Sequence, residues 1–280
     1  MSKRTIIIGD VHGCRAELEA LIAKVIPRKG DTVIFAGDLF DRGPDSAGVV
    51  RVARKLSERK GIKVVLVEGN HDEKHRRFRA HLARFRSGGS KVPIADAKGK
   101  KTAINDALSA ADVAFLDKAV LFHRIPEHDM LVVHGGVTPL VEELPADGSR
   151  LCDFKGKAKK LFAPMIRVRY VDIEGTQMTM AKTDPSIHLT WMEAYDGRFG
   201  RVVYGHEPYV DAAGPVEGYL GMSVGIDLGC VFGGRLCALV VNEDGTEEAV
   251  TVEAFDRYAS RSKRPVRQES DRQLNLDLAA

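Results

Sequence analysis

The sequence predicts an α/β fold, because short runs of apolar, β-forming residues alternate with segments of helical period. Residues 6–8, 32–35 and 64–67 have the composition of buried strands. Residues 15–25 and 44–60, which lie between them, repeat apolar side chains at helical spacing, and the second of these segments begins at a proline. Such strand–helix–strand units predict a mainly parallel sheet whose functional side chains gather at its carboxyl edge.

The later elements follow from the same patterns. Residues 72–86 have a helical pattern but are strongly basic, and residues 87–101 form a connector rich in glycine, serine and lysine. Residues 102–118 return to a helical pattern. Further strands are expected at residues 120–123, 130–133, 201–204, 222–227, 235–241 and 247–252.

We expect a single catalytic domain over residues 1–256, which contains two departures from the regular alternation. The first is the basic helical excursion at residues 74–118. The second is a cap-like insertion at residues 139–200, where turns and basic residues are mixed and no period is evident. Residues 257–280 are polar, which predicts a disordered tail.

The composition excludes several classes of protein. The 280 residues are 44% hydrophobic and 29% charged, as in ordinary globular proteins, and the net charge of +3 is too small to indicate nucleic-acid binding by itself. No apolar signal region follows Met1, and no apolar run approaches the roughly 18 residues of a membrane span. The four cysteines lack the spacing of a zinc site. We therefore expect reduced thiols in a cytoplasmic protein.

Five of the apolar runs lead into a side chain that can bind a metal, and most of these side chains lie beside a glycine. The central one is Asp38, in the stretch from Gly37 to Gly43 that follows the strand at residues 32–35. Because such strand ends meet at one edge of a sheet, carboxylate, amide and imidazole groups would gather there. This donor set suits manganese, iron, nickel or zinc, so the pattern predicts a two-metal hydrolytic site.

The order of these motifs resembles the phosphoprotein-phosphatase branch of the calcineurin-like metallophosphoesterases. The matching strings are GDVHG, GDLFDRG, GNHD, HGG and GH, and the resemblance covers about residues 5–255. It implies a metallophosphoesterase fold, with two facing β-sheets flanked by helices, and two divalent metal ions. Manganese is the expected metal, with iron, nickel or zinc as alternatives, and a hydroxide between the two ions would attack phosphorus. The implied ligands are Asp10, His12 and Asp38 for the first metal, and Asp38, Asn70, His134 and His206 for the second.

The resemblance also implies roles for residues next to the ligands. His71 would protonate the leaving oxygen as a general acid, and Asp41 would hold its imidazole. Arg42 would grip two phosphate oxygens through its planar guanidinium, although Asp41 and Arg42 could instead form a surface ion pair at a turn. A second phosphate-binding arginine is expected downstream, where Arg169 is the first candidate and Arg167 the alternative.

The second half of the chain narrows the resemblance to two groups of proteins. Residues 169–172, 191–197, 202–206 and 225–236 resemble two bacterial groups, the phosphatase module of polynucleotide kinase-phosphatases and the diadenosine-tetraphosphate hydrolases. Asp227, which follows a predicted strand, would orient a ligand histidine or stand as a simple turn residue. No Walker-type loop is present, so we expect no kinase module in this sequence.

Basic residues gather beside the predicted site. Residues 74–101 hold ten Lys or Arg and one acid, Asp96, and residues 155–169 hold six and no acid. Basic walls would steer polyanions toward the site, although such runs can also be solvated helix faces. We therefore expect hydrolysis of nucleotide or nucleic-acid-end phosphates, such as a dinucleoside polyphosphate or an RNA end. The alternatives are a serine/threonine protein phosphatase and, from another class, a non-catalytic binding module that keeps the fold.

The tail contains one short motif. The segment Gln-Leu-Asn-Leu-Asp-Leu, from Gln273 to Leu278, follows a polar linker. It resembles the peptides by which bacterial DNA-maintenance proteins dock on the replication sliding clamp, and its alternating apolar residues suit binding in a groove. The alternative is a frayed amphipathic chain end.

Overall fold

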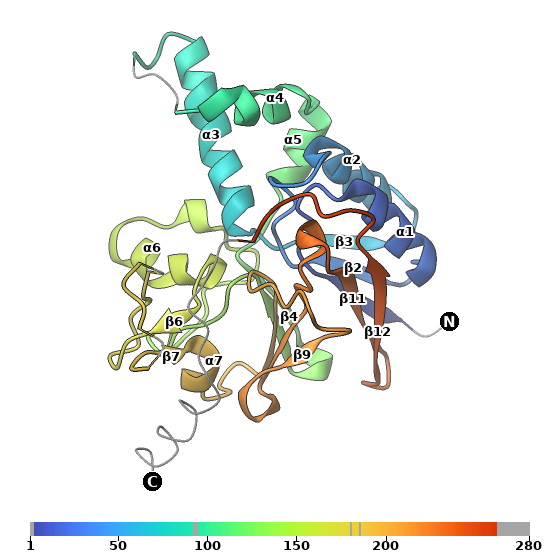
Figure 1. Ribbon diagram of the computed structural model, residues 1–280, viewed down its shortest axis with the longest axis vertical. Coiled ribbons are helices and arrows are strands. Elements are labelled where there is room, and N and C mark those ends of the chain that lie inside the picture. The colour runs from blue at the N-terminus through green and yellow to red at the C-terminus, as the bar shows by residue number, and fades with distance from the viewer. Residues whose placement is uncertain (1–2, 92–94, 180, 185, 262–280) are drawn as a thin grey trace.

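Two five-stranded β-sheets face each other at the centre of the molecule, with helices on the outside (Figure 1). The computed structural model describes residues 3–91, 95–179, 181–184 and 186–261. The first sheet has the order β12 (Glu247–Glu253), β11 (Arg235–Asn242), β1 (Arg4–Ile8), β2 (Thr32–Phe35) and β3 (Lys63–Leu66). The second has the order β4 (Phe122–Ile125), β5 (Met130–Val133), β8 (Arg201–Tyr204), β10 (Ser223–Gly225) and β9 (Val216–Glu217). The predicted arrangement of two facing sheets is confirmed.

Both sheets are mixed rather than mainly parallel as the sequence predicted. In the first sheet β1, β2 and β3 run parallel, whereas β11 and β12 are joined to them by antiparallel pairing. In the second sheet β5, β8 and β10 are parallel, and the edge strands β4 and β9 are antiparallel. The five strands that lead into candidate ligands are all among the parallel ones. Their carboxyl ends therefore point in a common direction within each sheet, as a shared site requires.

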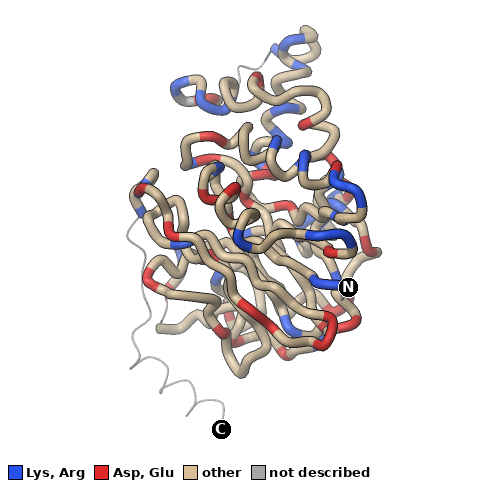
Figure 2. The backbone as a smooth tube through the Cα atoms, turned by 90° about the vertical axis from the view of Figure 1, so that its right-hand side faces the viewer, with Lys and Arg blue, Asp and Glu red and all other residues tan. Residues whose placement is uncertain are grey.

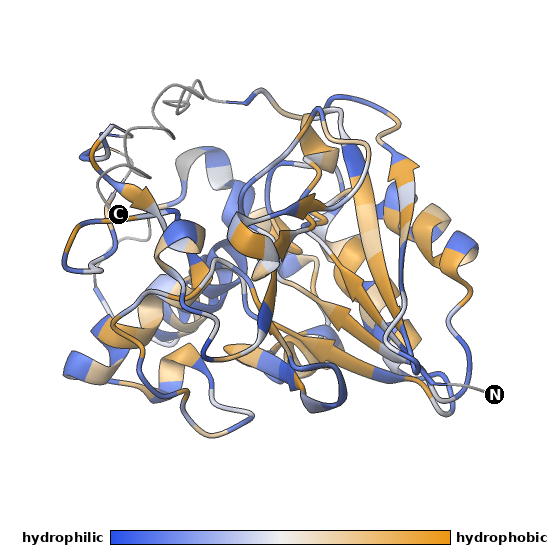
Figure 3. Cartoon of the chain, turned by 90° about the horizontal axis from the view of Figure 1, so that it is seen from below, coloured by the Kyte–Doolittle hydropathy of each residue, from blue (hydrophilic) through white to orange (hydrophobic). Residues whose placement is uncertain are grey.

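Alternation along the strands divides the core into layers. Ile6 and Ile8 of β1 pack with apolar residues of α1 (Arg15–Val25) and α2 (Ser46–Ser57), on the outer face of the first sheet. Ile7, between them, packs instead with Val132 and Val203 of the second sheet. This separation is expected, because successive side chains of a β-strand point to opposite faces of the sheet. Figure 3 shows the strands as the most hydrophobic part of the chain.

The helices follow the sequence closely in the first half. Helix α1 has the predicted bounds, and α2 begins at Ser46 because the carboxylate of Asp45 accepts a hydrogen bond from the backbone N–H of Gly48. Helix α3 (Asn70–Arg86) begins two residues before its predicted start, so that Asn70 and His71 lie in its first turn.

The helix predicted over residues 102–118 is two helices. They are α4 (Lys100–Asp106) and α5 (Ala110–Leu116), and the break lies at Ser109. Ser109 caps α5 and forms a capping box with Asp112, which is a stronger local signal for a helix start than the apolar period is for continuity. Figure 1 shows α3 projecting from the body of the molecule with α4 and α5 beside it.

The described residues of the segment predicted as a cap-like insertion form only short elements. Besides two 3-10 helices at Leu151–Asp153 and Ala163–Ile166, they are α6 (Gly156–Phe162), β6 (Tyr170–Val171), β7 (Leu189–Thr190) and α7 (Trp191–Ala194). Trp191 and Met165 pack with Tyr204 of β8 in a third apolar cluster, on the outer face of the second sheet. The described part of this segment therefore covers that face, while the predicted domain boundaries stay a prediction.

The first residues of the predicted tail are packed against the body. Tyr258 donates a hydrogen bond to Glu17 of α1 at 2.8 Å, and the backbone N–H of Ala259 donates to the carbonyl of Val231 at 2.9 Å. The chain from Gln273 to Leu278 lies outside the described residues, and with it the predicted sliding-clamp motif.

Two expectations from the composition can be compared with the described residues. All four cysteines are free thiols, as expected. None of the described helices combines the length and the apolar character needed to cross a membrane.

Candidate metal centre

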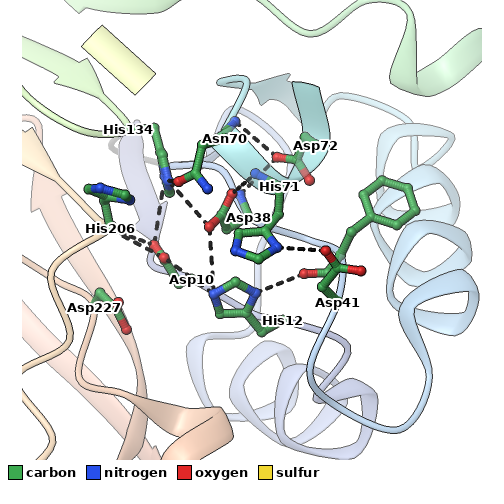
Figure 4. A network of polar contacts seen from close by, with 12 residues as sticks. Asp10, His12, Asp38, Asp41, Asn70, His71, Asp72, His134, His206 and Asp227 are labelled. Atoms are coloured by element: carbon green, nitrogen blue, oxygen red, sulfur yellow. Dashed lines mark hydrogen bonds and ion pairs between the residues drawn. The ribbon is translucent and has the colours of Figure 1, made fainter. Parts of the chain in front are cut away.

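Five strand ends converge on one group of polar side chains (Figure 4). Asp10 and His12 follow β1, Asp38 follows β2, and Asn70 lies just after β3 in the first turn of α3. From the second sheet, His134 follows β5 and His206 follows β8. All six predicted ligands therefore meet between the two sheets, and five of them are buried. Those five are Asp10, His12, Asp38, His134 and His206.

The glycines beside the ligands allow a close approach of the chain. A Cβ atom on Gly69 would collide with the carboxylate of Asp38, and one on Gly205 would collide with that of Asp10. The backbone N–H of His206, next to Gly205, donates hydrogen bonds to both Asp10 oxygens at 3.1 and 3.2 Å. Glycine is therefore needed at these two positions because a carboxylate occupies the space of a side chain.

Several residues of the site have a strained backbone. His12, Asp38 and His206 adopt left-handed conformations, with φ of 45°, 51° and 66°. Asp41 and Arg42 do so as well, at 70° and 72°. Non-glycine residues are uncommon in this region, and a cluster of them is typical of functional sites, where the surrounding structure holds the side chains in place.

Asp38 lies between two groups of metal-ligating atoms. Its Oδ2 atom is 3.5 Å from Nε2 of His12 and 3.4 Å from Nε2 of His134. Asp10 Oδ2 lies 3.9 Å from the same nitrogen of His12, and Oδ1 of Asn70 lies 3.2 Å from Nε2 of His134. The two clusters that the geometry forms are His12, Asp38 and His71, and Asp38, His134 and His206. A carboxylate common to both clusters is the arrangement that a bridging ligand requires.

Backbone carbonyls orient the three candidate histidine ligands. The contacts are His12 Nδ1 to Phe40 O at 2.8 Å, His134 Nδ1 to Ala36 O at 2.9 Å, and His206 Nε2 to Arg167 O at 3.0 Å. Each carbonyl requires a proton on the ring nitrogen that faces it. In the neutral imidazole the other nitrogen then has a lone pair available for a metal, and that nitrogen is Nε2 in His12 and His134 and Nδ1 in His206.

The charges of the buried groups fit cations. Burial and the neighbouring Asp227 raise the pKa of Asp10 well above its ordinary value. Burial opposes ionisation of Asp38 too, but His134, His71 and His12 hold its pKa well below its usual range. Burial lowers the pKa of His12 to about 4, which leaves it neutral. Buried carboxylates beside the neutral imidazole of His12 form a donor set that divalent metals bind, and a bound cation would relieve the repulsion between the acids.

Asp41 and His71 form a close pair beside this cluster. Nδ1 of His71 lies 2.7 Å from Oδ2 of Asp41, and the backbone N–H of His71 donates to Oδ1 of Asp38 at 2.8 Å. The ammonium of Lys74 also donates to Asp41, at 2.8 Å. Burial alone would raise the pKa of Asp41, but its hydrogen bonds from His71, His75 and Lys74 hold it well below its ordinary value. Asp41 is thus an ionised hydrogen-bond partner of the His71 imidazole, and its role in holding that imidazole for catalysis stays a prediction.

His75 is a partner of Asp41 that the motifs did not reveal. Its side chain is buried and stacks on the ring of Phe40, with the two centroids 4.6 Å apart. Its Nε2 lies 2.8 Å from Oδ1 of Asp41, and its Nδ1 accepts a hydrogen bond from the side-chain amide of Asn105 at 2.8 Å. The same amide donates to the carbonyl of Lys101. Since Nδ1 accepts, Nε2 carries the proton and donates to Asp41.

Asp72 is the second residue that sequence reasoning missed, although it lies inside the GNHD string. It is buried, and its carboxylate accepts hydrogen bonds from the backbone N–H groups of Asp38, Leu39 and Gly69, at 2.8, 2.9 and 3.0 Å. Burial and the charge of Asp38 raise its pKa to about 7. Asp72 therefore links the loop that carries Asp38 to the start of α3.

The arginines lie around the entrance to the ligand cluster. Arg42 lies over the ring of Phe232, with its guanidinium carbon 5.2 Å from the centroid, and both residues line a small cavity of about 110 Å³ above the ligands. Arg169 lines the same cavity and is held by Glu207 and by the carbonyl of His206. Arg167 does not line this cavity but lines an adjoining one. Of the two downstream candidates, Arg169 is therefore the one whose side chain lines both cavities.

Asp227 lies at the site but makes a different contact from the one predicted. It is buried, lines the small cavity and accepts a hydrogen bond from the backbone N–H of Gly229 at 2.9 Å. Within the described residues, no hydrogen bond joins its carboxylate to a ligand histidine. Burial raises its pKa to about 6, with smaller contributions from Glu207 and Asp38.

Comparisons with known proteins agree with this geometry. A family model described as calcineurin-like phosphoesterase matches residues 3–213. The chain is 29% identical over 264 residues to the asymmetrical bis(5'-nucleosyl)-tetraphosphatase PrpE of Bacillus velezensis, covering 90% of this chain and 93% of the relative. It is 27% identical over 269 residues to the protein of the same name in Bacillus subtilis, covering 93% and 98%. A solved structure provisionally described as a diadenosine tetraphosphatase has 27% identity and a TM-score of 0.62, over 91% of this chain and 96% of that one.

Proposed function

This chain belongs to the calcineurin-like phosphoesterase family and is a hydrolase of phosphate esters, and we propose that its substrates are nucleotides that carry linked phosphates. The observation that carries the proposal is the meeting of two ligand clusters at Asp38, directly beside the Asp41–His71 pair. A non-catalytic binding module is the weaker alternative for two reasons. The chain belongs to a metal-dependent family, and every predicted metal ligand is present in the group of side chains between the two sheets.

The family implies divalent metals, and the residues fit two of them. Our assignment places one cation at Asp10, His12 and Asp38, and the other at Asp38, Asn70, His134 and His206. When bound, such cations supply Lewis acidity that draws charge from the phosphate oxygens and lowers the pKa of the attacking water. Manganese is our proposed metal, because oxygen and imidazole donors suit it, and iron, nickel and zinc remain alternatives.

The chain's own groups would then bind the phosphate and move one proton. Arg42 and Arg169 line the cavity above the ligands and would donate hydrogen bonds to phosphate oxygens. As the bond from phosphorus to the leaving oxygen breaks, the His71 imidazolium would give its proton to that oxygen. Asp41, hydrogen-bonded to His71 Nδ1, keeps the opposite nitrogen directed at the substrate and stabilises the charged ring.

Two observations support a nucleotide substrate. The relatives with matching length are named as tetraphosphatases of bis(5'-nucleosyl) compounds, and the chain covers more than four fifths of each. In addition, cationic side chains surround the described entrance to the site. RNA ends and phosphoproteins remain substrates to be tested, and a cytoplasmic location remains a prediction from the sequence.

The experiment starts from protein that has been stripped of metal and then supplied with manganese. Turnover is measured on p-nitrophenyl phosphate, diadenosine tetraphosphate, a 5'-phosphorylated RNA oligonucleotide and a phosphothreonine peptide, and metal content is measured by mass spectrometry. We expect about two metal ions per chain, metal-dependent turnover, and the highest kcat/KM for diadenosine tetraphosphate.

The control is Asp38→Asn, which should be inactive on every substrate. A higher kcat/KM for the phosphopeptide would replace the nucleotide proposal with a protein phosphatase. If no substrate were hydrolysed with any of the four candidate metals, the assigned catalytic site would be wrong.

A further inference from the structure

A second cavity adjoins the small one above the ligands. Its volume is about 340 Å³, three times that of the small cavity, and the two share Asn70, Arg169 and His206 as lining residues. A volume of about 300 Å³ is the lower limit for pockets that bury a drug-sized ligand, so the small cavity is sized for a phosphate and the larger one for the remainder of a substrate. A substrate bound at the metal ligands can therefore extend directly into the larger cavity.

Cations dominate the lining of the larger cavity. Lys74, Arg77, Arg167 and Arg169 line it together with a single carboxylate, that of Glu73. Arg77 Nε lies 2.9 Å from Glu73, an Arg167 Nη atom lies 3.6 Å from it and one of Arg76 lies 4.0 Å from it, so this one acid is shared by three guanidinium groups. The side chains of Lys74, Arg77 and Arg167 are 44%, 64% and 40% exposed, which leaves them accessible to a ligand.

Most of the basic excursion does not contribute to this cavity. Figure 2 shows Lys and Arg along the projecting helices, but Arg76 pairs with Glu68 and Arg86 pairs with Asp106. Neither arginine lines the cavity. The basic run is therefore divided. Arg76 and Arg86 pair with acids outside the cavity, whereas Lys74 and Arg77, which pair with Asp41 and Glu73, line it.

The cavity residues of α3 form a row that leads away from the ligands. Asn70, Lys74 and Arg77 are spaced four and three residues apart, which places them on one face of the helix. With a rise of 1.5 Å per residue the row extends roughly 10 Å along the helix axis. It begins at Asn70, which precedes His71 in the chain, and His71 lines the small cavity, so a leaving group that takes a proton from His71 would lie near the start of the row.

We propose that this cavity binds the phosphates of the leaving nucleotide, which makes the enzyme selective for phosphoanhydrides of nucleotides over simple monoesters. The inference rests on the proposed function and adds to it the part of the substrate that decides selectivity. In the reaction, water forms the new bond to phosphorus, the bridging oxygen leaves with its polyphosphate, and the proton from His71 neutralises one charge on that oxygen. A leaving group without phosphates would leave Lys74, Arg77 and Arg167 without an anionic partner from the substrate. Gln177, Met178 and Thr179, which also line the cavity, carry no charge and suit a nucleoside.

The first test compares substrates whose leaving groups differ in phosphate number. We expect kcat/KM to rise from p-nitrophenyl phosphate to diadenosine diphosphate, triphosphate and tetraphosphate. Arg77→Gln should lower kcat/KM for diadenosine tetraphosphate about tenfold, as the loss of one charge-assisted hydrogen bond predicts, and change that for p-nitrophenyl phosphate less than twofold. Arg77→Lys should restore most of the loss. Arg84→Gln, an exposed residue of the same helix outside the cavity, should change neither substrate.

The second test measures binding without catalysis. Calorimetry with inorganic triphosphate and metal-free protein should detect binding to the wild-type chain that weakens about tenfold in Arg77→Gln and weakens further as salt is raised. This measurement separates the two proposals, because it gives a result even if no substrate is turned over. Equal losses on p-nitrophenyl phosphate and diadenosine tetraphosphate, or unchanged triphosphate binding in Arg77→Gln, would overturn the assignment of the cavity.

Discussion

The strand ends and the two segments beside them contribute different things to the site. Asp10, Asp38 and His134 at the strand ends are buried, and their positions follow from the sheets. Arg77 of α3 and Arg167 of the 139–200 segment are exposed cations in the wall of a cavity. We infer that the strand ends provide the chemistry for any phosphate ester, whereas the flanking segments select among esters. Changes at the strand ends should thus affect all substrates alike, and changes in the flanks should not.

The largest effect is expected for Asp38→Asn. Asp38 belongs to both ligand clusters, and an amide could not replace its negative charge between the two proposed cations. We expect kcat/KM to fall on the order of 10⁴-fold or more on every substrate, beyond the range typical for a lost general acid. Mass spectrometry should show a loss of bound metal. Full metal content with activity on one substrate class would contradict the role of Asp38.

His71→Gln should have the next largest effect and should begin to separate substrates. The loss of a general acid costs about 10²- to 10⁴-fold when the leaving group is poor. The p-nitrophenolate ion leaves readily without a proton, so turnover of p-nitrophenyl phosphate should fall less than that of an alkyl phosphate. Metal content should be unchanged, which distinguishes the variant from Asp38→Asn. An equal loss on both substrates would exclude proton donation by His71.

The sequence predicts the strand ends well because their chemistry is local. Each apolar run that ends beside Asp, Asn or His becomes a strand with its ligand at the carboxyl edge, and all six ligands meet. The glycines next to them reflect contacts that the sequence cannot display directly, since Gly205 has no room for a side chain only because Asp10 lies against it. The sequence thus identifies the glycines beside the candidate ligands, but only the structure shows which groups occupy the space of their missing side chains.

The flanks were harder to predict because their contacts join distant parts of the chain. The partner of His75 in the excursion is Asn105, which lies 30 residues away with a connector between them. No periodic pattern marks such a pair. The apolar period predicts one helix across the break between α4 and α5, although Ser109 and Asp112 form a recognisable capping box there. The sequence around Asp227 likewise gives no sign that its carboxylate accepts a hydrogen bond from the backbone of Gly229 rather than from a histidine.

Metal binding should depend on pH, because His134 must lose a proton. Burial opposes protonation, but Asp38 and Asp10 raise the pKa of His134 in the metal-free protein to about 10. A cation bound at its Nε2 displaces that proton, so apparent metal affinity should fall about tenfold for each unit that pH decreases below 10. Calorimetry in buffers of different ionisation enthalpy should measure the release of at least one proton. A pH-independent affinity between pH 6 and 8 would contradict this assignment.

The stability of the metal-free protein should follow the same group. The folded pKa of His134 lies above the ordinary value of 6.5, so its contribution to stability is fully present below about pH 6.5 and is lost as pH rises toward 10. The denaturant midpoint of metal-free protein should therefore decrease across this window. In His134→Gln this decrease should be smaller.

The smallest effect is expected for substitutions of His75. This residue makes no hydrogen bond to a candidate metal ligand or to a described residue that lines either cavity, but it donates one to Asp41. In His75→Leu, Asp41 loses a donor at 2.8 Å while the apolar contact with Phe40 is largely retained. We expect kcat for an alkyl phosphate to fall about tenfold, the low end for groups that orient a catalytic partner, because Asp41 then holds His71 less firmly. Turnover of p-nitrophenyl phosphate should fall less.

His75→Gln is the matched control, because its side-chain amide can still donate to Asp41. If His75 acts through that hydrogen bond, His75→Gln should recover most of the kcat for the alkyl phosphate, while both variants keep the melting temperature within a few degrees of each other. Equal losses in the two variants, or equal losses on the two substrates, would mean that His75 only fills space beside Phe40. In that case the selectivity between esters would depend on the cavity cations alone, and the excursion would contribute Lys74 and Arg77 but no control over the proton donor.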